Sequence, residues 1–346
     1  MTKIDIRSLS LNELREFFFL NGYKKFRGNQ VYEWLWKKST KDINEMSNIS
    51  KEVRDFLISK FVINHIELDS IQKSSDGTIK NAIKLHDNLI VESVLIPTKN
   101  RMTACISSQV GCSLNCKFCA TASLKRMRNL NPDEIYDQVV TINNQSIEYY
   151  DKPLTNIVFM GMGEPLMNYN NVLKSIEKIT STNGLGMSPK RIVVSTSGIP
   201  KLIKKMADDK VKFNLAVSLH SAIDDIRTSI MPFNEKFKLN ELRKSLEYWF
   251  NKTKKRITYE YVVWEGINDK IEDVKALVQF CKFAPSKVNL IQYNSIDNPN
   301  FKQASNIAIS MYIKILEKNN ITVTVRRSRG KDIDAACGQL ANKSSN

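Results

Sequence analysis

Residues 102–121 read MTACISSQVGCSLNCKFCAT and hold the most informative pattern of this 346-residue chain. Cys112, Cys116 and Cys119 follow one another with the spacing CxxxCxxC, directly after a short run that is typical of a buried strand. Three thiolates can bind three irons of a cubic iron–sulfur cluster and leave the fourth iron without a protein ligand. A structural site would use every coordination position, so an incomplete ligand set indicates a reactive centre. We therefore expect a 4Fe-4S cluster whose open iron binds a small molecule.

Two other interpretations of these cysteines stay open. Zinc could be bound if Cys105 supplied a fourth thiolate. A disulfide is less favoured, because the first residues are rich in charge and lack the apolar stretch of a secretory signal. No apolar run approaches the length of about 18 residues that a membrane span needs. We expect a soluble protein of the reducing cytoplasm that does not bind membranes.

The composition indicates a globular protein with a polyanionic partner. Hydrophobic residues make up 42% of the chain, enough for a substantial core, and 52 Lys and Arg against 36 Asp and Glu give a net charge of +16. Basic runs lie at 24–27, 125–128, 252–256 and 326–331. One such run is more often a solvated surface, but four runs around one cysteine-bearing core favour RNA over a membrane.

Hydrophobic periodicity divides the chain into a helical part and a mixed part. Residues 11–60 show short helical segments, and residues 78–96 read as two strands around a turn at His86. Beyond residue 100, strand and helix patterns alternate, which is typical of a parallel sheet. The expected strands span residues 102–108, 156–163, 191–197, 213–220, 257–264 and 288–294, with a further candidate at 321–327.

These patterns predict an α/β fold: a partial, open TIM-like β/α barrel of about six units, preceded by a small helical accessory domain. The expected divisions are a helical RNA-binding domain at 1–75, a β-hairpin and linker at 76–100, the barrel at 101–330, and a C-terminal loop and tail at 331–346. In such barrels the C-terminal ends of the strands carry the chemistry.

The expected strand ends carry polar residues and glycines that suit a ligand pocket. The second barrel strand ends in GMGEP at 161–165, where glycines let a ligand approach the backbone and Glu164 could bind an ammonium group. Later strands end in groups able to hydrogen-bond a ribose and an adenine: Ser195, Ser218, His220 and Asn294. Each residue alone is typical of a strand cap, but together they predict a pocket.

Taken together, the motifs resemble a known family. The cysteine motif followed by GMGEP resembles the radical S-adenosylmethionine superfamily, which makes S-adenosylmethionine the expected ligand of the open iron. The fuller set, ISSQVGCSLNCKFCAT, FMGMGEPLMN, VVSTSG, AVSLH, LIQYN and RRSRGKDIDAACGQL, is similar to the RlmN family of bacterial RNA adenine C2 methyltransferases. The C8 methyltransferase family Cfr shares the cysteines and the DAACGQL tail, but GEPLMN, STSG and RRSRG fit the C2 family better.

The resemblance implies a role for each matching residue. It makes Cys112, Cys116 and Cys119 the cluster ligands. It assigns the cofactor to Gly163, Glu164, Ser195, Ser218, Leu219, His220 and Asn294. It makes Cys337 the methyl acceptor, Cys105 its resolving partner and Glu92 the proton acceptor. Small residues around Cys337 are expected to give that loop freedom to move, whereas Cys281 has no motif and is expected to be a buried small residue.

The implied reaction consumes two molecules of S-adenosylmethionine per turnover. Cys337 takes a methyl group from the first molecule by displacement, and a radical derived from the second activates that methyl group for addition to the electron-poor C2 carbon. Cys105 then resolves the protein–RNA adduct by forming a disulfide with Cys337. The family acts on an adenine of 23S rRNA and an anticodon-loop adenine of tRNA, either of which must leave its stack to enter a barrel. A flavodoxin- or ferredoxin-like reductant and a monomer are expected, and the rival from another class is a non-catalytic, zinc-stapled RNA-binding protein.

Overall fold

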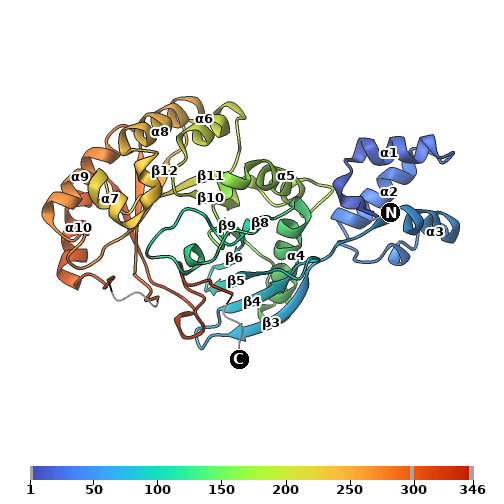
Figure 1. Ribbon diagram of the computed structural model, residues 1–346, viewed down its shortest axis with the longest axis horizontal. Coiled ribbons are helices and arrows are strands. Elements are labelled where there is room, and N and C mark those ends of the chain that lie inside the picture. Colours follow the sequence, from blue (N-terminus) through green and yellow to red (C-terminus); the bar gives the residue numbers. More distant parts are fainter. Residues whose placement is uncertain (1–2, 297–299, 343–346) are drawn as a thin grey trace.

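A ten-stranded sheet organises the chain in the computed structural model, which describes residues 3–296 and 300–342 (Figure 1). Its strand order is β14-β13-β12-β11-β10-β9-β6-β5-β4-β3. The strands from β6 to β14 pair in parallel with their neighbours. They are β6 (Arg101–Cys105), β9 (Asn156–Phe159), β10 (Ile192–Thr196), β11 (Asn214–Ser218), β12 (Ile257–Val262), β13 (Ser286–Ile291) and β14 (Thr322–Arg326). The partial barrel is therefore confirmed, and the candidate strand at 321–327 is β14.

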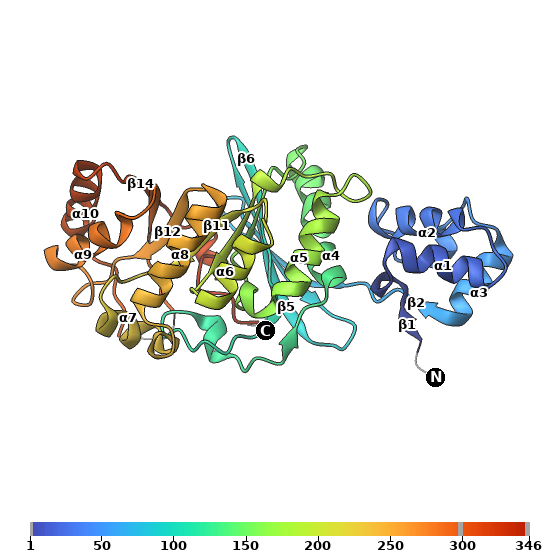
Figure 2. The same ribbon diagram turned by 90° about the horizontal axis from the view of Figure 1, so that it is seen from above.

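Helices connect these strands and cover the outer face of the sheet, as Figures 1 and 2 show. They are α4 (Pro132–Tyr150), α5 (Tyr169–Thr180), α6 (Pro200–Asp208), α7 (Asp224–Ile230), α8 (Leu239–Thr253), α9 (Ile271–Cys281) and α10 (Asn306–Lys318). Local sequence explains where they begin. Helix α4, for example, starts at a proline and has a capping box in which the Glu134 carboxylate accepts a hydrogen bond from the Asn131 N–H.

Three antiparallel strands extend the sheet beyond β6. They are β5 (Ile90–Thr98), β4 (Ile79–Lys84) and β3 (Glu67–Lys73). The expected hairpin at 78–96 thus corresponds to β4 and β5. Strand β3 lies inside the span 1–75 that the sequence assigned to the helical domain, but it is hydrogen-bonded to β4 and so belongs to the sheet.

The helical lobe contains α1 (Leu11–Leu20), α2 (Phe26–Trp36) and α3 (Lys51–Lys60), and lies to one side of the barrel beside α4 (Figure 2). The short strands β1 (Ile4–Asp5) and β2 (Phe61–Val62) pair at its base. In the described residues, no helix is long and apolar enough to cross a bilayer.

Arg7 joins the lobe to the barrel. Its side chain is almost fully buried, and its Nη1 and Nη2 lie 2.8 Å and 3.2 Å from the carboxylates of Asp137 and Asp133 on α4. Nη2 also donates to the carbonyl of Asn64, 2.5 Å away. Nearby, the Tyr136 hydroxyl of α4 donates to the carbonyl of Trp36 of α2. Buried charges are costly unless they are paired. This network therefore fixes the lobe to the barrel only while both the Arg7 guanidinium and the carboxylates of α4 are present.

We therefore expect Arg7→Met to lower the free energy of unfolding by about 3–5 kcal/mol, because it leaves two carboxylates buried without their cation. Urea unfolding followed by circular dichroism measures this change. The matched control is Lys25→Met, which removes an exposed pair with Glu16 and should cost less than about 1 kcal/mol. Equal effects of the two substitutions would contradict the buried network.

Candidate active site

A cavity of about 1350 Å³, its open mouth included, lies at the C-terminal ends of the barrel strands. It brings together residues that are far apart in the sequence. The predicted residues on its wall are Cys105, Cys112, Cys116, Cys119, Gly163, Glu164, Ser195, Ser218, His220, Asn294 and Cys337. The expectation that strand ends form one pocket thus agrees with the geometry. Leu219 and Glu92 are the two predicted residues that do not line it.

The loop after β6 carries the three motif cysteines across the mouth of the barrel. Gly111 begins it with a φ of +74°, and a Cβ there would lie 2.4 Å from the carbonyl oxygen of Lys125, so only glycine fits. Within the loop, the N–H of Cys119 donates to the carbonyl of Cys116 at 3.1 Å. Phe118 anchors the loop by packing against His220 and Trp264. The backbone thereby directs the three thiols into one cavity.

The chemistry of these thiols fits a group with positive charge. Burial raises the pKa of Cys112 to about 11, and burial, followed by the neighbouring thiols, raises the pKa of Cys116 well above its ordinary value. Burial also raises the pKa of Cys119. Three thiolates close together in this cavity are unfavourable by themselves, and a metal centre is what would hold them deprotonated. Within the described residues, no three His, Cys, Asp or Glu side chains converge as a single-ion site requires; the cysteines instead surround a cavity.

The remaining wall offers hydrogen-bonding groups to a nucleoside. The Oδ1 of Asn294 is buried and has no partner in the part of the chain described. Such groups are costly unless a ligand satisfies them. Gly163 has a φ of +93°, and a Cβ there would lie 2.5 Å from the Cβ of Gln109. This close packing keeps the wall free of a side chain where a ligand would pass.

Glu164 and His220 are both fixed by backbone contacts. The Glu164 carboxylate accepts from the N–H groups of Leu166 at 3.0 Å and Ser197 at 2.8 Å, while burial raises its pKa. His220 accepts from the N–H of Val262 through Nδ1, and burial lowers its pKa to about 3. The imidazole is therefore neutral at physiological pH, with its proton on Nε2, where it can donate a hydrogen bond.

The C-terminal tail closes the cavity and lies against the cysteine loop. The carbonyl of Gly338 accepts from the N–H of Ala120 at 2.7 Å, and the carbonyl of Leu340 accepts from the Thr121 hydroxyl at 2.6 Å. The amide of Asn294 donates to the carbonyl of Cys337 at 3.1 Å. The small residues led us to expect a mobile loop, and in this structure the segment is docked. Its last four residues, 343–346, lie outside the described residues.

Two further free thiols line the cavity, and the docked tail supplies one of them. Cys337 is the exposed cysteine of the tail, and it lines the cavity. Cys105 is buried at the end of β6, where burial, with a smaller contribution from Cys337, raises its pKa to about 12. Although the Cys337 side chain is accessible, desolvation by the surrounding cavity wall raises its pKa to about 11, and the positive charge of Arg326 acts in the opposite direction. Both sulfurs are therefore thiols at neutral pH unless a neighbouring positive charge intervenes.

Comparisons with known proteins agree with this geometry. Residues 4–63 match the profile of the ribosomal RNA large subunit methyltransferase N-terminal domain, and residues 106–281 match the radical SAM superfamily. The chain is 69% identical over 342 residues to the probable dual-specificity RNA methyltransferase RlmN of Christiangramia forsetii, covering 99% of this chain and 97% of that protein. It is 40% identical to the dual-specificity RNA methyltransferase RlmN of Geotalea uraniireducens, covering 98% and 97%.

The chain belongs to the RlmN family. A solved radical SAM methyltransferase from Sphaerobacter thermophilus superimposes with a TM-score of 0.91 at 34% identity, covering 97% of this chain and 99% of that one. The protein is thus an S-adenosylmethionine-dependent methyltransferase whose cofactors are a 4Fe-4S cluster and S-adenosylmethionine. Family membership also decides against zinc as the bound metal and against the non-catalytic RNA-binding protein.

In this RlmN-family chain, Glu92 holds the tail. Its Oε2 accepts from the N–H groups of Ala341 at 2.8 Å and Asn342 at 3.1 Å, and its Oε1 lies 3.5 Å from the Lys80 ammonium. Leu219 is fully buried, and its N–H donates to the carbonyl of Glu260 at 3.0 Å. Contact between these two residues and a ligand stays a prediction.

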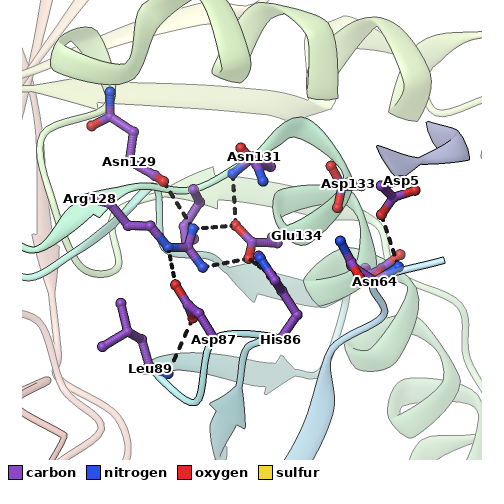
Figure 3. A network of polar contacts seen from close by, with 12 residues as sticks. Asp5, Asn64, His86, Asp87, Leu89, Arg128, Asn129, Asn131, Asp133 and Glu134 are labelled. Carbon is purple, nitrogen blue, oxygen red and sulfur yellow. Dashed lines mark hydrogen bonds and ion pairs between the residues drawn. The ribbon is translucent and has the colours of Figure 1, made fainter. Parts of the chain in front are cut away.

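The basic runs prove to be partly structural. Figure 3 shows Arg128, from the run 125–128, bonded to both oxygens of Glu134 at 2.7 Å and to Asp87 at 2.5 Å. His86 lies 3.2 Å from the same Glu134 carboxylate, so the β4–β5 turn is tied to the start of α4. In the run 252–256, Lys255 caps the carbonyls of residues 211 and 213. These side chains position the scaffold, so the runs offer fewer free cations for RNA than their sequence suggests.

Sequence reasoning missed two charged residues of the cavity wall, Arg326 and Glu260. Arg326 was grouped with the basic run 326–331 and assigned to RNA. Its position as the last residue of β14 was the available signal, because strand ends face the cavity in such barrels. Glu260 lies within β12, and nothing in its local pattern distinguishes it from an ordinary strand residue.

We expect Cys116→Ala to abolish the visible absorbance and iron content of the purified, reconstituted protein, because it removes one of the three thiolates predicted to hold the cluster. The control is Cys281→Ala. Cys281 is buried in α9, away from the cavity. Iron content that survives in the Cys116 variant, or disappears in the Cys281 variant, would contradict the assigned ligands.

Proposed function

We propose that this protein methylates C2 of an adenine, in 23S rRNA and in tRNA, through a methylated Cys337 and a disulfide between Cys337 and Cys105. One observation carries the proposal: the cavity holds two sets of thiols, three on the loop after β6 and two contributed by β6 and the tail. The first set serves the cofactor. The second set is what a methyl acceptor and its resolving partner require, since each is a sulfur nucleophile.

Two parts of the proposal, methylation at C2 and the choice of 23S rRNA and tRNA as substrates, rest on the sequence motifs and on the names of relatives. The relatives at 69% and 40% identity are named as dual-specificity RNA methyltransferases, and GEPLMN, STSG and RRSRG favour C2 over C8. A base must leave its stack to enter the cavity, so the RNA substrate is a loop or a locally opened segment. We place the protein in the cytoplasm as a monomer that receives electrons from a flavodoxin- or ferredoxin-like partner.

We assign the remaining roles from the resemblance of the motifs, and the presence of most of these residues on the cavity wall supports the assignment. Gly163 and Glu164 receive the methionyl end of the cofactor, and Ser195, Ser218, Leu219, His220 and Asn294 the nucleoside end. Glu92 acts as proton acceptor only after it exchanges its present contacts for a bond to the substrate, because the N–H groups of Ala341 and Asn342 occupy its Oε2, the Lys80 ammonium lies 3.5 Å from its Oε1, and Glu92 does not line the cavity in the docked conformation. The tail must therefore move between steps.

The product decides between the C2 and C8 reactions. We expect nuclease digestion and mass spectrometry of 23S rRNA and tRNA treated with the reduced holoprotein to show 2-methyladenosine. Unmodified RNA incubated without S-adenosylmethionine is the control. Finding 8-methyladenosine alone would overturn the choice of carbon, and finding no methylated adenine in either RNA would overturn the proposed function.

Substitutions of Cys337 and Cys105 should stop the reaction at different steps. Cys337→Ala removes the methyl acceptor, so methyl transfer falls below detection while iron content stays normal. Cys105→Ala leaves the adduct unresolved, so a covalent protein–RNA species accumulates on denaturing gels. Cys281→Ala, outside the cavity, should behave as wild type. Normal turnover of the Cys105 variant would exclude its resolving role.

A further inference from the structure

The floor of the cavity holds an ion pair that the roles above do not use. Arg326 at the end of β14 and Glu260 on β12 both line the cavity, and their Nη1 and Oε2 atoms are 3.2 Å apart. The Glu260 side chain is almost fully buried, and its Oε1 accepts from the amide of Asn289 at 2.8 Å. This second bond fixes the carboxylate, which in turn fixes the guanidinium.

The same guanidinium lies close to the second set of thiols. Its Nη1 is 3.9 Å from the sulfur of Met160, the residue that directly follows β9. Cys105 pairs with Val158 of that strand, so Met160 lies two residues beyond the sheet partner of Cys105 while its side chain contacts Arg326. The Arg326 side chain remains 40% exposed to the cavity, and its Nε and Nη2 bond no other described residue. These donors are free to stabilise negative charge in the cavity.

We infer that Arg326, held in place by Glu260, stabilises the thiolate of Cys105 when that sulfur attacks the sulfur of Cys337. The inference rests on the proposed function, since it assigns a positioning and electrostatic residue to the resolving step. In that step, an electron pair of the Cys105 sulfur forms the S–S bond while the bond from the Cys337 sulfur to the adduct carbon breaks. The released pair goes to that carbon, which takes up a proton and becomes the methyl group of the product. The sulfurs are oxidised and the carbon is reduced, so the step needs no other oxidant.

The Cys105 thiolate requires a nearby cation, because it forms in a buried place. Burial raises the pKa of Cys105 to about 12, so the reactive thiolate is scarce at neutral pH, and the positive charge of Arg326 acts in the opposite direction. An arginine suits this task because it stays protonated under all working conditions and has several N–H donors in a rigid plane. A single donor, Nη1, is shared with Glu260 and Met160.

The test measures the rate at which the protein–RNA adduct is resolved, separately from the methylation of Cys337 and the formation of the adduct. Cys337 is first methylated to completion, as checked by intact-protein mass, and RNA is then added to the reduced holoprotein for a single turnover. We expect Arg326→Gln to form the covalent protein–RNA species but to resolve it about tenfold more slowly than wild type or more, and Arg326→Lys to recover part of that rate. The matched control is Arg243→Gln, which also loses a glutamate pair, with Glu247, but on the outer surface of α8.

Arg326→Gln leaves Glu260 without its cation and could fold poorly, so the double variant with Glu260→Gln is measured in parallel. It removes both charges and should show the same slow resolution. The inference is overturned if the folded variants resolve the adduct at the wild-type rate, if they form no adduct, or if Arg326→Lys is no faster than Arg326→Gln. Failure of wild type to make 2-methyladenosine would instead contradict the proposed function.

Discussion

The hydrogen bonds between the C-terminal tail and the cysteine loop are the contacts on which the account of this protein depends. Gly338 and Leu340 bond to Ala120 and Thr121, immediately after the last motif cysteine. These bonds carry Cys337 into the cavity where the three motif cysteines and Cys105 already lie. Without them the fold would still be a partial barrel, but the sulfur proposed to accept the methyl group would have no fixed place in it.

The antiparallel part of the sheet, β3 to β5, also holds the C-terminal tail. The turn between β3 and β4 holds one end of the tail, where Asp332 accepts from the hydroxyl of Ser74 at 2.6 Å and the N–H of Ser75 at 3.0 Å. Strand β5 holds the other end through Glu92. The tail is thus fixed at both ends and can release one without losing the other, which is how a docked segment can still move between catalytic steps.

Much of the fold could be predicted from the sequence, because its signals are local. Strand and helix patterns alternate with distinct periods, and the motif cysteines follow the first barrel strand. Both the barrel and the position of the cysteine loop could therefore be predicted. The docked position of the tail could not be predicted. Small residues around Cys337 favour flexibility, and the bonds that hold them come from positions as distant as Glu92 and Thr121.

The roles of charged residues were the hardest to predict, because their bonding partners are also distant in the sequence. A run such as RRSRGK has one composition, but its first arginine faces the cavity beside Glu260 while Arg329 bonds to the turn before β4. Arg128 similarly belongs to a basic run and is bonded to Glu134 and Asp87. Only the pairing of strands distant in the sequence decides which cations stay available to RNA.

Peptide mapping of the protein after one turnover, with thiols alkylated before digestion, tests the shared cavity most directly. The account predicts a disulfide that joins the peptide of Cys105 to the peptide of Cys337, formed in proportion to methylated RNA. Product formed while both cysteines remain alkylatable, or a disulfide from Cys337 to any other cysteine, would contradict it.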